Sequence, residues 1–412
     1  MIRLATLAAG CFLLNGIAFA ASPNPDSLII STESVTRAHG LIRQLGSDTY
    51  RDREKATREL RQMGRLALPA LAKTLTVEAD PEVRTRCEWL LPLAEADDMA
   101  ARVAAFLADT DGKFTHDLPG WNRYRDVAGS DAPARALFAE MVKNRDNHEL
   151  LLAIRHSAEE LGRSIASRRL NIQMQISPPF PVPGRQQSIM PTLPDIATLL
   201  LAETLVPERL APIGGYQYHV SNFFYQPQGR DAVNGNGRFG PSFRKLAINW
   251  LDTRDGPNGA MTAMNLAQNL GLGAAEVSKH AARSLTVAGM HPWNKANALG
   301  MIARNQSKEH LPAMIKAFTD ETALVRGVPN AQPDIQVRDA ALAMTLILTE
   351  QDPKAYGMNL QVPEAAAKFN PTAHAFRDEA GLSADDKRTA AFKKWEKWAE
   401  TNLKDGKLKT QP

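Results

Sequence analysis

The stretch that decides the fold spans residues 68–75 and has the sequence LPALAKTL. Its apolar pattern, proline and lysine recur at residues 311–318, where the sequence is LPAMIKAF. Each copy is followed by a second helical segment that opens with Val-Arg, at Val83 and at Val337. Recurrence of this kind is typical of stacked helical hairpins, in which each hairpin buries its apolar face against the next. The pattern therefore predicts an all-α protein built as an α-solenoid, with long irregular insertions in its middle.

The segments around the first copy carry a helical period and clear helix boundaries. Positions i, i+3, i+4 and i+7 of the first helix form one apolar stripe, namely Ala38, Leu41, Ile42 and Leu45. Gly64 marks the end of the next helix, because glycine readily adopts the conformations that terminate helices. Asp80 followed by Pro81 supplies an N-cap and a first turn for a further helix. Leu71 and Cys87 are expected to face the core of this block.

A second feature recurs in the second helix of each hairpin, where an arginine is followed three residues later by a small residue. The pairs are Arg53 with Ala56, Arg84 with Cys87, and Arg338 with Ala341. Small residues at these positions let neighbouring helices approach closely. The arginines are expected to bind a turn or a neighbouring carboxylate.

These segments resemble HEAT repeats, best over residues 35–95 and 275–350. The first block is similar to the N-terminal hairpins of secreted bacterial HEAT-like proteins. The sequence LPGW at 118–121, Tyr124 and the sequence ARALF at 134–138 resemble the segment that follows such hairpins. The resemblance implies an armadillo-like α-solenoid that binds or scaffolds proteins, and it carries over no catalytic residues.

The N-terminus has the features of a secretory signal peptide. Arg3 supplies a positive charge, residues 4–19 are almost wholly apolar, and the small residues around Ala20 suit cleavage after that position. We therefore expect export to the periplasm or secretion, with no transmembrane segment once the signal is removed. Cys87 would then be the only cysteine, so no internal disulfide is expected and its thiol should be a small buried group.

The amino-acid composition indicates a folded protein and argues against a nucleic-acid binder. Of 412 residues, 44% are hydrophobic and 23% are charged, values that are ordinary for a folded protein. The 49 basic and 45 acidic residues nearly balance, with a net charge of +4. Dedicated nucleic-acid binders usually carry a strong basic stripe, so we do not expect a nucleic-acid partner.

The chain divides into six predicted parts. They are a signal peptide at 1–20, a linker at 21–34, HEAT-like hairpins at 35–110, an irregular helical segment at 111–244, HEAT-like helices at 245–403 and a polar tail at 404–412. Within the irregular segment, helices are predicted at 148–168 and 195–207, a proline-rich stretch at 176–194 and an aromatic, glycine-rich loop at 212–243. Residues 322–334 are predicted to be an insertion inside a hairpin.

The aromatic loop is the best candidate for a binding site. Its candidate residues are Tyr216, Tyr218, His219, Phe223, Phe224, Tyr225 and Arg230. Such side chains could stack on a glycan or grip a protein partner. The alternative, which we favour, is that these aromatics cap the open end of the helical core.

The sequence contains partial matches to metal-binding motifs, but their ligands do not have the spacing that these motifs require. Asp109 opens a sequence similar to a calcium loop, but Lys113 and Phe114 occupy positions that need a ligand and a glycine. A helix-ending turn is the better interpretation. His148 and His156 are eight residues apart, whereas a zinc helix needs a spacing of four. We therefore predict no metal, no cofactor and no catalytic residues.

Two hypotheses about function remain. The first is an exported, non-enzymatic HEAT-like scaffold that binds protein partners. The second is an extracellular enzyme on an α/α toroid, similar to a polysaccharide lyase, in which tyrosine and histidine act as base and acid. A cleft lined by Tyr218, His219 and Arg230 would favour the second hypothesis.

Overall fold

The structure is a computed structural model that describes residues 21–77, 80–178, 189–212, 218–327, 333–379, 381–404 and 406–409. The predicted signal peptide, most of the proline-rich stretch and Tyr216 lie outside these residues. Helices dominate the described chain, and its strands form only three two-stranded antiparallel pairs, which confirms the all-α class. None of the helices in this part of the chain combines the length and apolarity that a membrane span requires.

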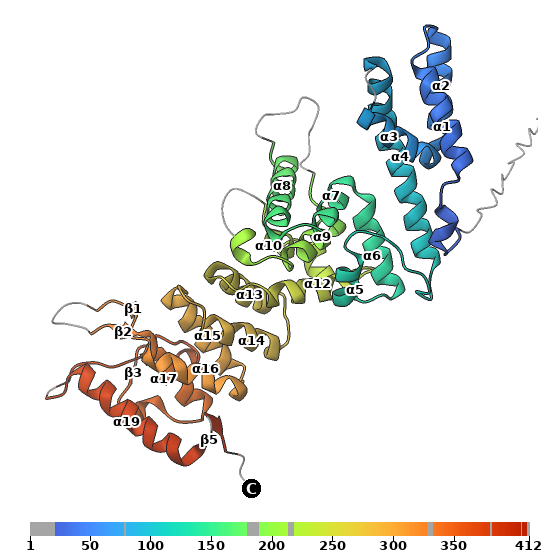
Figure 1. Cartoon of the computed structure of the whole chain (residues 1–412). Coiled ribbons are helices and arrows are strands. Elements are labelled where there is room, and N and C mark those ends of the chain that lie inside the picture. The colour runs from blue at the N-terminus through green and yellow to red at the C-terminus, as the bar shows by residue number, and fades with distance from the viewer. Residues whose placement is uncertain are drawn as a thin grey trace, which may run out of the picture. The chain divides into compact units, whose positions relative to one another are not determined.

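The chain folds as two compact units, Met1–Leu118 and Pro119–Pro412. In the first unit, α1 packs against α2 and α3 packs against α4 (Figure 1). Its elements are the 3₁₀ helix η1 (Pro25–Leu28), α1 (Thr32–Leu45), α2 (Tyr50–Met63), η2 (Gly64–Ala67), α3 (Leu68–Val77) and α4 (Pro81–Ala108).

The core of the first unit confirms the predicted apolar stripe. Its buried residues are Ala38, Leu41, Ile42, Leu45, Ala56, Leu60, Ala67, Ala70, Leu71, Val83, Cys87, Leu90 and Ala94. The predicted caps are also present: Asp80 accepts hydrogen bonds from the backbone N–H groups of Glu82 and Val83 at the start of α4. Cys87 is fully buried, as expected for a small core residue. The α4 helix is 28 residues long, so its second half extends beyond the hairpin core.

Two of the recurring arginines, Arg53 and Arg338, bind a turn and a carboxylate, as the sequence predicts. Arg53 donates to the backbone oxygen of Ser47 at 2.7 Å, in the turn between α1 and α2. Arg338 pairs with the carboxylate of Glu321 at 2.6 Å. The small residues that follow them, Ala56 and Ala341, are fully buried.

Replacement of Gly64 by alanine is expected to lower the free energy of unfolding of the first unit by about 2 kcal/mol. Gly64 ends α2 with φ of +53°, and an added Cβ would lie 2.7 Å from Oδ2 of Asp97. That oxygen pairs with Arg61 at 2.8 Å, so the substitution strains the backbone and displaces an ion pair. Urea denaturation measures the loss.

Gly112 offers a matched control for this substitution. Its φ is +63°, but an added Cβ would meet no described atom within 4 Å. Gly112→Ala should therefore cost only about 1 kcal/mol, the backbone contribution alone. Equal losses for the two variants would contradict the role assigned to the contact with Asp97.

The second unit begins with a cluster of helices around α9. These elements are α5 (Trp121–Ala128), α6 (Ala132–Lys143), α7 (Arg145–Ala153), α8 (Ala158–Ile176), α9 (Leu193–Glu203), η3 (Glu208–Leu210), α10 (Val220–Phe224), α11 (Pro227–Val233) and α12 (Gly240–Asp252). Residues 195–203 of α9 are all buried, because α6, α7, α8, α10 and α12 pack around this helix. Figure 1 shows α9 among these neighbours.

The remainder of the second unit continues as consecutive helices, with α12 against α13, α13 against α14, α14 against α15 and α15 against α17. These and the last elements are α13 (Pro257–Asn269), α14 (Ala274–Ser284), α15 (Pro292–Arg304), η4 (Lys308–His310), α16 (Leu311–Lys316), η5 (Ala317–Thr319), β1 (Ala323–Val325), β2 (Ile335–Gln336), α17 (Val337–Leu348), η6 (Pro353–Tyr356), β3 (Asn359–Leu360), α18 (Glu364–Ala367), β4 (His374–Ala375), α19 (Ala384–Asn402), β5 (Leu403–Lys404) and β6 (Lys407–Leu408).

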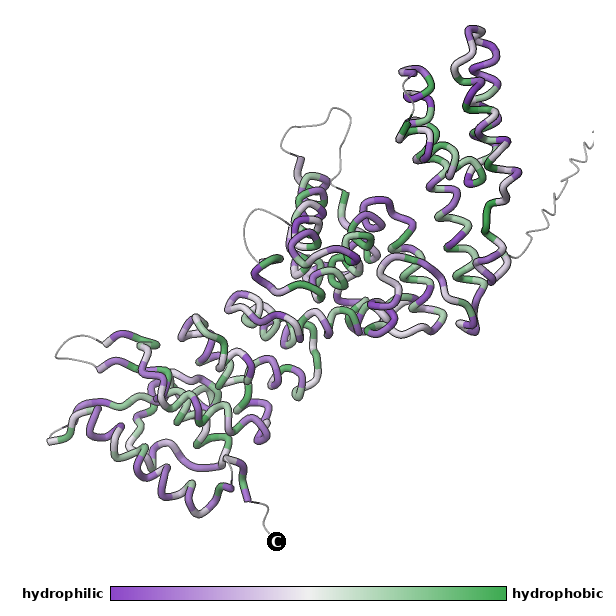
Figure 2. Tube along the Cα trace, in the orientation of Figure 1, coloured by the Kyte–Doolittle hydropathy of each residue, from purple (hydrophilic) through white to green (hydrophobic). Residues whose placement is uncertain are grey.

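The second copy of the repeated pattern, at residues 311–318, forms α16 and the start of η5. Leu311 and Met314 of α16 are buried, and α16 packs against α17. The predicted insertion at 322–334 contains β1 and the residues that lead to β2, its antiparallel partner. Hydrophilic residues predominate along α19 in Figure 2, although Trp395 on its inner face is buried.

The structure corrects four predictions about the less regular segments. The linker at 21–34 contains η1, and α1 already begins at Thr32. The helix predicted at 148–168 is two helices, α7 and α8, because Ser157 caps a new helix. The helix predicted at 195–207 is α9, which ends at Glu203. The block at 245–403 and the tail at 404–412 include short strand pairs among their described residues.

The largest correction concerns the predicted loop at 212–243. Its described part forms α10, α11 and the start of α12. The α10 helix has five residues and α11 has seven, too few turns to show a helical period in the sequence. Gly229 lies so close to α10 that a Cβ there would stand 2.1 Å from the backbone oxygen of Phe223. The glycine therefore serves close helix packing and not loop flexibility.

Candidate functional site

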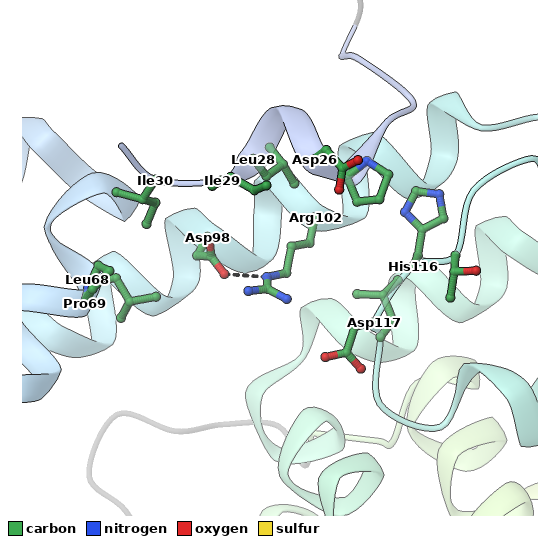
Figure 3. Close-up of a pocket in the computed structure, with 13 residues that line it drawn as sticks. Asp26, Leu28, Ile29, Ile30, Leu68, Pro69, Asp98, Arg102, His116 and Asp117 are labelled. Atoms are coloured by element: carbon green, nitrogen blue, oxygen red, sulfur yellow. Dashed lines mark hydrogen bonds and ion pairs between the residues drawn. The ribbon is translucent and has the colours of Figure 1, made fainter. Parts of the chain in front are cut away.

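A groove in the first unit is the candidate site. Its volume is about 570 Å³, and four segments form it: η1 with the extended residues that follow, the start of α3, the second half of α4 and the segment at 115–118. The lining residues are Pro25, Asp26, Leu28, Ile29, Ile30, Leu68, Pro69, Asp98, Arg102, Thr115, His116, Asp117 and Leu118. Figure 3 shows Leu68 and Pro69 at one end of the groove and His116 and Asp117 at the other.

Local sequence explains how η1 forms one wall. The side chain of Asn24 accepts a hydrogen bond from the backbone N–H of Asp26 at 2.9 Å, and Pro25 occupies the first turn of η1. Arg65 of η2 donates to the backbone oxygen of Leu28 at 2.7 Å. This long-range hydrogen bond ties η1 to the helical core, so the wall has a fixed position within the unit.

The apolar part of the groove includes Ile29. Its backbone is extended, with φ of −60° and ψ of 126°, and its side chain is 75% exposed. Leu28, Ile30 and Leu68 are only partly buried beside it. Apolar side chains that remain open to solvent in a recess provide a surface for another apolar group.

The polar part of the groove is an ion pair on α4. Nε of Arg102 donates to Oδ2 of Asp98 at 2.6 Å, across one turn of the helix (Figure 3). The other carboxylate oxygen of Asp98 lies 3.9 Å from Arg65. The side chain of Asp98 is 11% exposed and that of Arg102 is 45% exposed. Arg102 therefore presents a guanidinium to the groove while Asp98 holds it in place.

A buried carboxylate shapes the far end of the groove. Asp109, at the end of α4, accepts hydrogen bonds from the backbone N–H groups of Lys113 at 2.9 Å and Phe114 at 3.0 Å. Nε2 of His116 lies 3.1 Å from Oδ2 of Asp109. Burial alone would raise the pKa of Asp109, but these hydrogen bonds outweigh burial and lower it. The geometry confirms that this sequence is a helix-ending turn, and the turn positions His116 in the wall.

The six described residues among the seven predicted from the sequence do not gather at one surface. Tyr218, Phe223 and Phe224 are buried, whereas Tyr225 and Arg230 are exposed. His219 is partly exposed, and Tyr216 lies outside the described residues. The described members are therefore divided between the interior and the surface.

The buried aromatics belong to the core of the second unit. The ring centroids of Phe223 and Phe243 lie 5.8 Å apart, and those of Phe224 and Trp250 lie 6.1 Å apart. This packing favours the interpretation that the aromatics cap the core. Burial also raises the pKa of Tyr218, whereas a tyrosine that acts as a base needs a lowered one.

Sequence reasoning missed the groove because its residues come from the supposed linker and from three distant segments. The sequence Asn24-Pro25-Asp26 was an available signal, since an asparagine before a proline is a helix-start pattern. The two isoleucines that follow, Ile29 and Ile30, were a second signal, because they lie between a turn and a helix cap.

Comparison with known proteins found no matching family model, no matching curated protein and no matching solved structure.

Proposed function

We propose that the protein is an exported HEAT-like scaffold that binds a protein partner through the groove of its first unit. The observation that carries the proposal is Ile29, which is 75% exposed beside a groove of about 570 Å³. Export is inferred from the N-terminal sequence alone. The HEAT-like character is inferred from the recurrence of the pattern at 68–75 and from the pairing of α1 with α2 and of α3 with α4.

The chemistry of the groove specifies the kind of partner. Its lining carries the carboxylates of Asp26, Asp98 and Asp117 but only one guanidinium, that of Arg102. An apolar side chain next to Ile29, flanked by a lysine or arginine, would complement this lining in shape and charge. We infer that the groove takes a partner segment with these two features.

Replacement of Ile29 by aspartate should abolish capture of the partner from the exported fraction. The substitution places a charge that must be desolvated where an apolar contact is proposed, and it adds a carboxylate to an already acidic groove. Because Ile29 is exposed, the free energy of unfolding should change by no more than about 0.5 kcal/mol. Affinity capture followed by mass spectrometry, with chemical denaturation in parallel, measures both quantities.

Val77 provides the matched control. It is also 75% exposed and lies in the same unit, but it does not line the groove. Val77→Asp should therefore capture the same partner as the unmodified protein. Loss of the partner in both variants, or retention in both, would refute the assignment of the groove.

A further inference from the structure

Two carboxylates and a histidine meet in the second unit. Asp252 is the last residue of α12, while Glu276 and His280 lie one turn apart on α14. Nε2 of His280 lies 3.7 Å from Oδ1 of Asp252 and 4.0 Å from Oε2 of Glu276. One ligand atom from each of the three residues falls within 4.8 Å of the others.

His280 is the unusual member of this group. It is only 1% exposed, yet neither of its ring nitrogens has a hydrogen-bond partner among the described residues. Buried polar groups are nearly always paired, because an unpaired one loses its hydration without compensation. The imidazole therefore directs Nε2 toward two carboxylates without a hydrogen bond to either.

The backbone around the cluster holds the three side chains together. Arg283 of α14 donates to the backbone oxygens of Leu251 and Asp252, the last two residues of α12. These hydrogen bonds fix the end of α12 against α14, so Asp252 keeps its place opposite Glu276 and His280.

We propose that Asp252, Glu276 and His280 bind one divalent transition-metal ion of the Zn²⁺ class. One imidazole nitrogen and two carboxylate oxygens suit such an ion, whose ligand bonds are about 2.0–2.2 Å long. Tetrahedral ligands at that distance stand roughly 3.4 Å apart. The separations of 3.7 and 4.0 Å from Nε2 of His280 therefore contract by about half an ångström, and the two carboxylate oxygens, which lie within 4.8 Å of each other, close the remaining gap by side-chain rotation. The two carboxylates, with 35% and 38% exposed side chains, also leave the ion a path from solvent.

Lys279 is the group with which a metal ion competes. Its ammonium lies 2.7 Å from Oδ1 of Asp252 and 3.5 Å from Oε2 of Glu276. Its side chain is 48% exposed, so it is free to turn into solvent when a metal ion takes the carboxylates.

Titration of the chelator-treated, full-length protein with Zn²⁺ tests the site. The protein should carry a purification tag without histidines, and calorimetry should give one site per chain. Co²⁺ in place of Zn²⁺ should give a visible absorption band, which reports protein ligands directly. His280→Gln should weaken binding by more than about tenfold. Lys279→Met removes the competing ammonium and should strengthen binding by roughly threefold.

Two further variants keep the test decisive. Glu276→Gln changes a partly exposed side chain, so it should weaken binding even where His280→Gln disturbs folding. His156 and Glu160 form another histidine–glutamate pair four residues apart in the sequence, with Nδ1 of His156 3.5 Å from Oε2 of Glu160. His156→Ala should leave binding unchanged. The proposal is overturned by equal affinity in the unmodified protein, Glu276→Gln and His280→Gln, or by the absence of binding in both the unmodified protein and Lys279→Met.

Discussion

Replacement of Glu203 by alanine is expected to lower the free energy of unfolding of the second unit by about 3–5 kcal/mol. Glu203 is fully buried at the end of α9. Its Oε1 lies 2.8 Å from Arg169, and its Oε2 accepts a hydrogen bond from Nε1 of Trp250 at 2.7 Å. The carboxylate therefore joins α8, α9 and α12 in one polar network inside an apolar core.

The cost arises from the arginines that the substitution leaves behind. Arg169 is 2% exposed and Arg254 is fully buried, with its guanidinium 3.9 Å from Oε2 of Glu203. Burial lowers the pKa of Arg254, and the charge of Glu203 opposes that lowering. Without the carboxylate, two cations remain buried without their shared anion, which is the most costly way to break a buried ion pair.

Chemical denaturation measures this loss against an exposed glutamate. The side chain of Glu149 is 63% exposed, and it pairs with Arg145, whose side chain is 77% exposed, at 3.3 Å. Glu149→Ala should therefore change stability by less than about 0.5 kcal/mol. Similar losses in the two variants would contradict the structural role assigned to Glu203.

Replacement of Leu71 by aspartate should unfold the helices of the first unit. Leu71 is 1% exposed and lies in the cluster that joins α1 to α4. A carboxylate there loses its hydration among the apolar side chains of this cluster, at a cost of at least about 4 kcal/mol. A loss of that size approaches the whole stability of a unit of this length.

Hydrogen exchange followed by mass spectrometry resolves the two units separately. In Leu71→Asp, amides of α1, α3 and α4 should lose protection, whereas Ala72→Asp should leave them protected because Ala72 lies on the exposed face of α3. Unchanged protection in Leu71→Asp would show that this face of α3 is not part of the core.

The fold was predictable from the sequence where a helical period of apolar residues was bounded by clear helix-starting and helix-ending residues. The stripe of Ala38, Leu41 and Leu45 has the helical period and is buried, since packing follows the period when helices are long. Gly64 ends α2 and Asp80 caps α4, because both effects depend on a few neighbouring residues. Helices of five and seven residues around Phe223 show no such period, so the sequence suggested a loop there.

The candidate sites were harder to predict, because they depend on contacts between distant segments. Ile29 and Arg102 are 73 positions apart, and only the fold places them in one groove. The burial of Glu203 and Arg254 likewise depends on how α9 meets α12. The sequence does contain one indication of the proposed metal site. Glu276 and His280 are four residues apart, a spacing that places two side chains on the same face of a helix.

Site-specific photo-crosslinking tests the proposed binding role most directly. A photoreactive benzophenone amino acid is placed at position 29 in the groove and, in a second variant, at position 77 outside it. After irradiation in cells that produce the protein, position 29 should give a covalent adduct with one partner protein, and position 77 should not. No adduct at position 29, or the same adducts at both positions, would contradict the account.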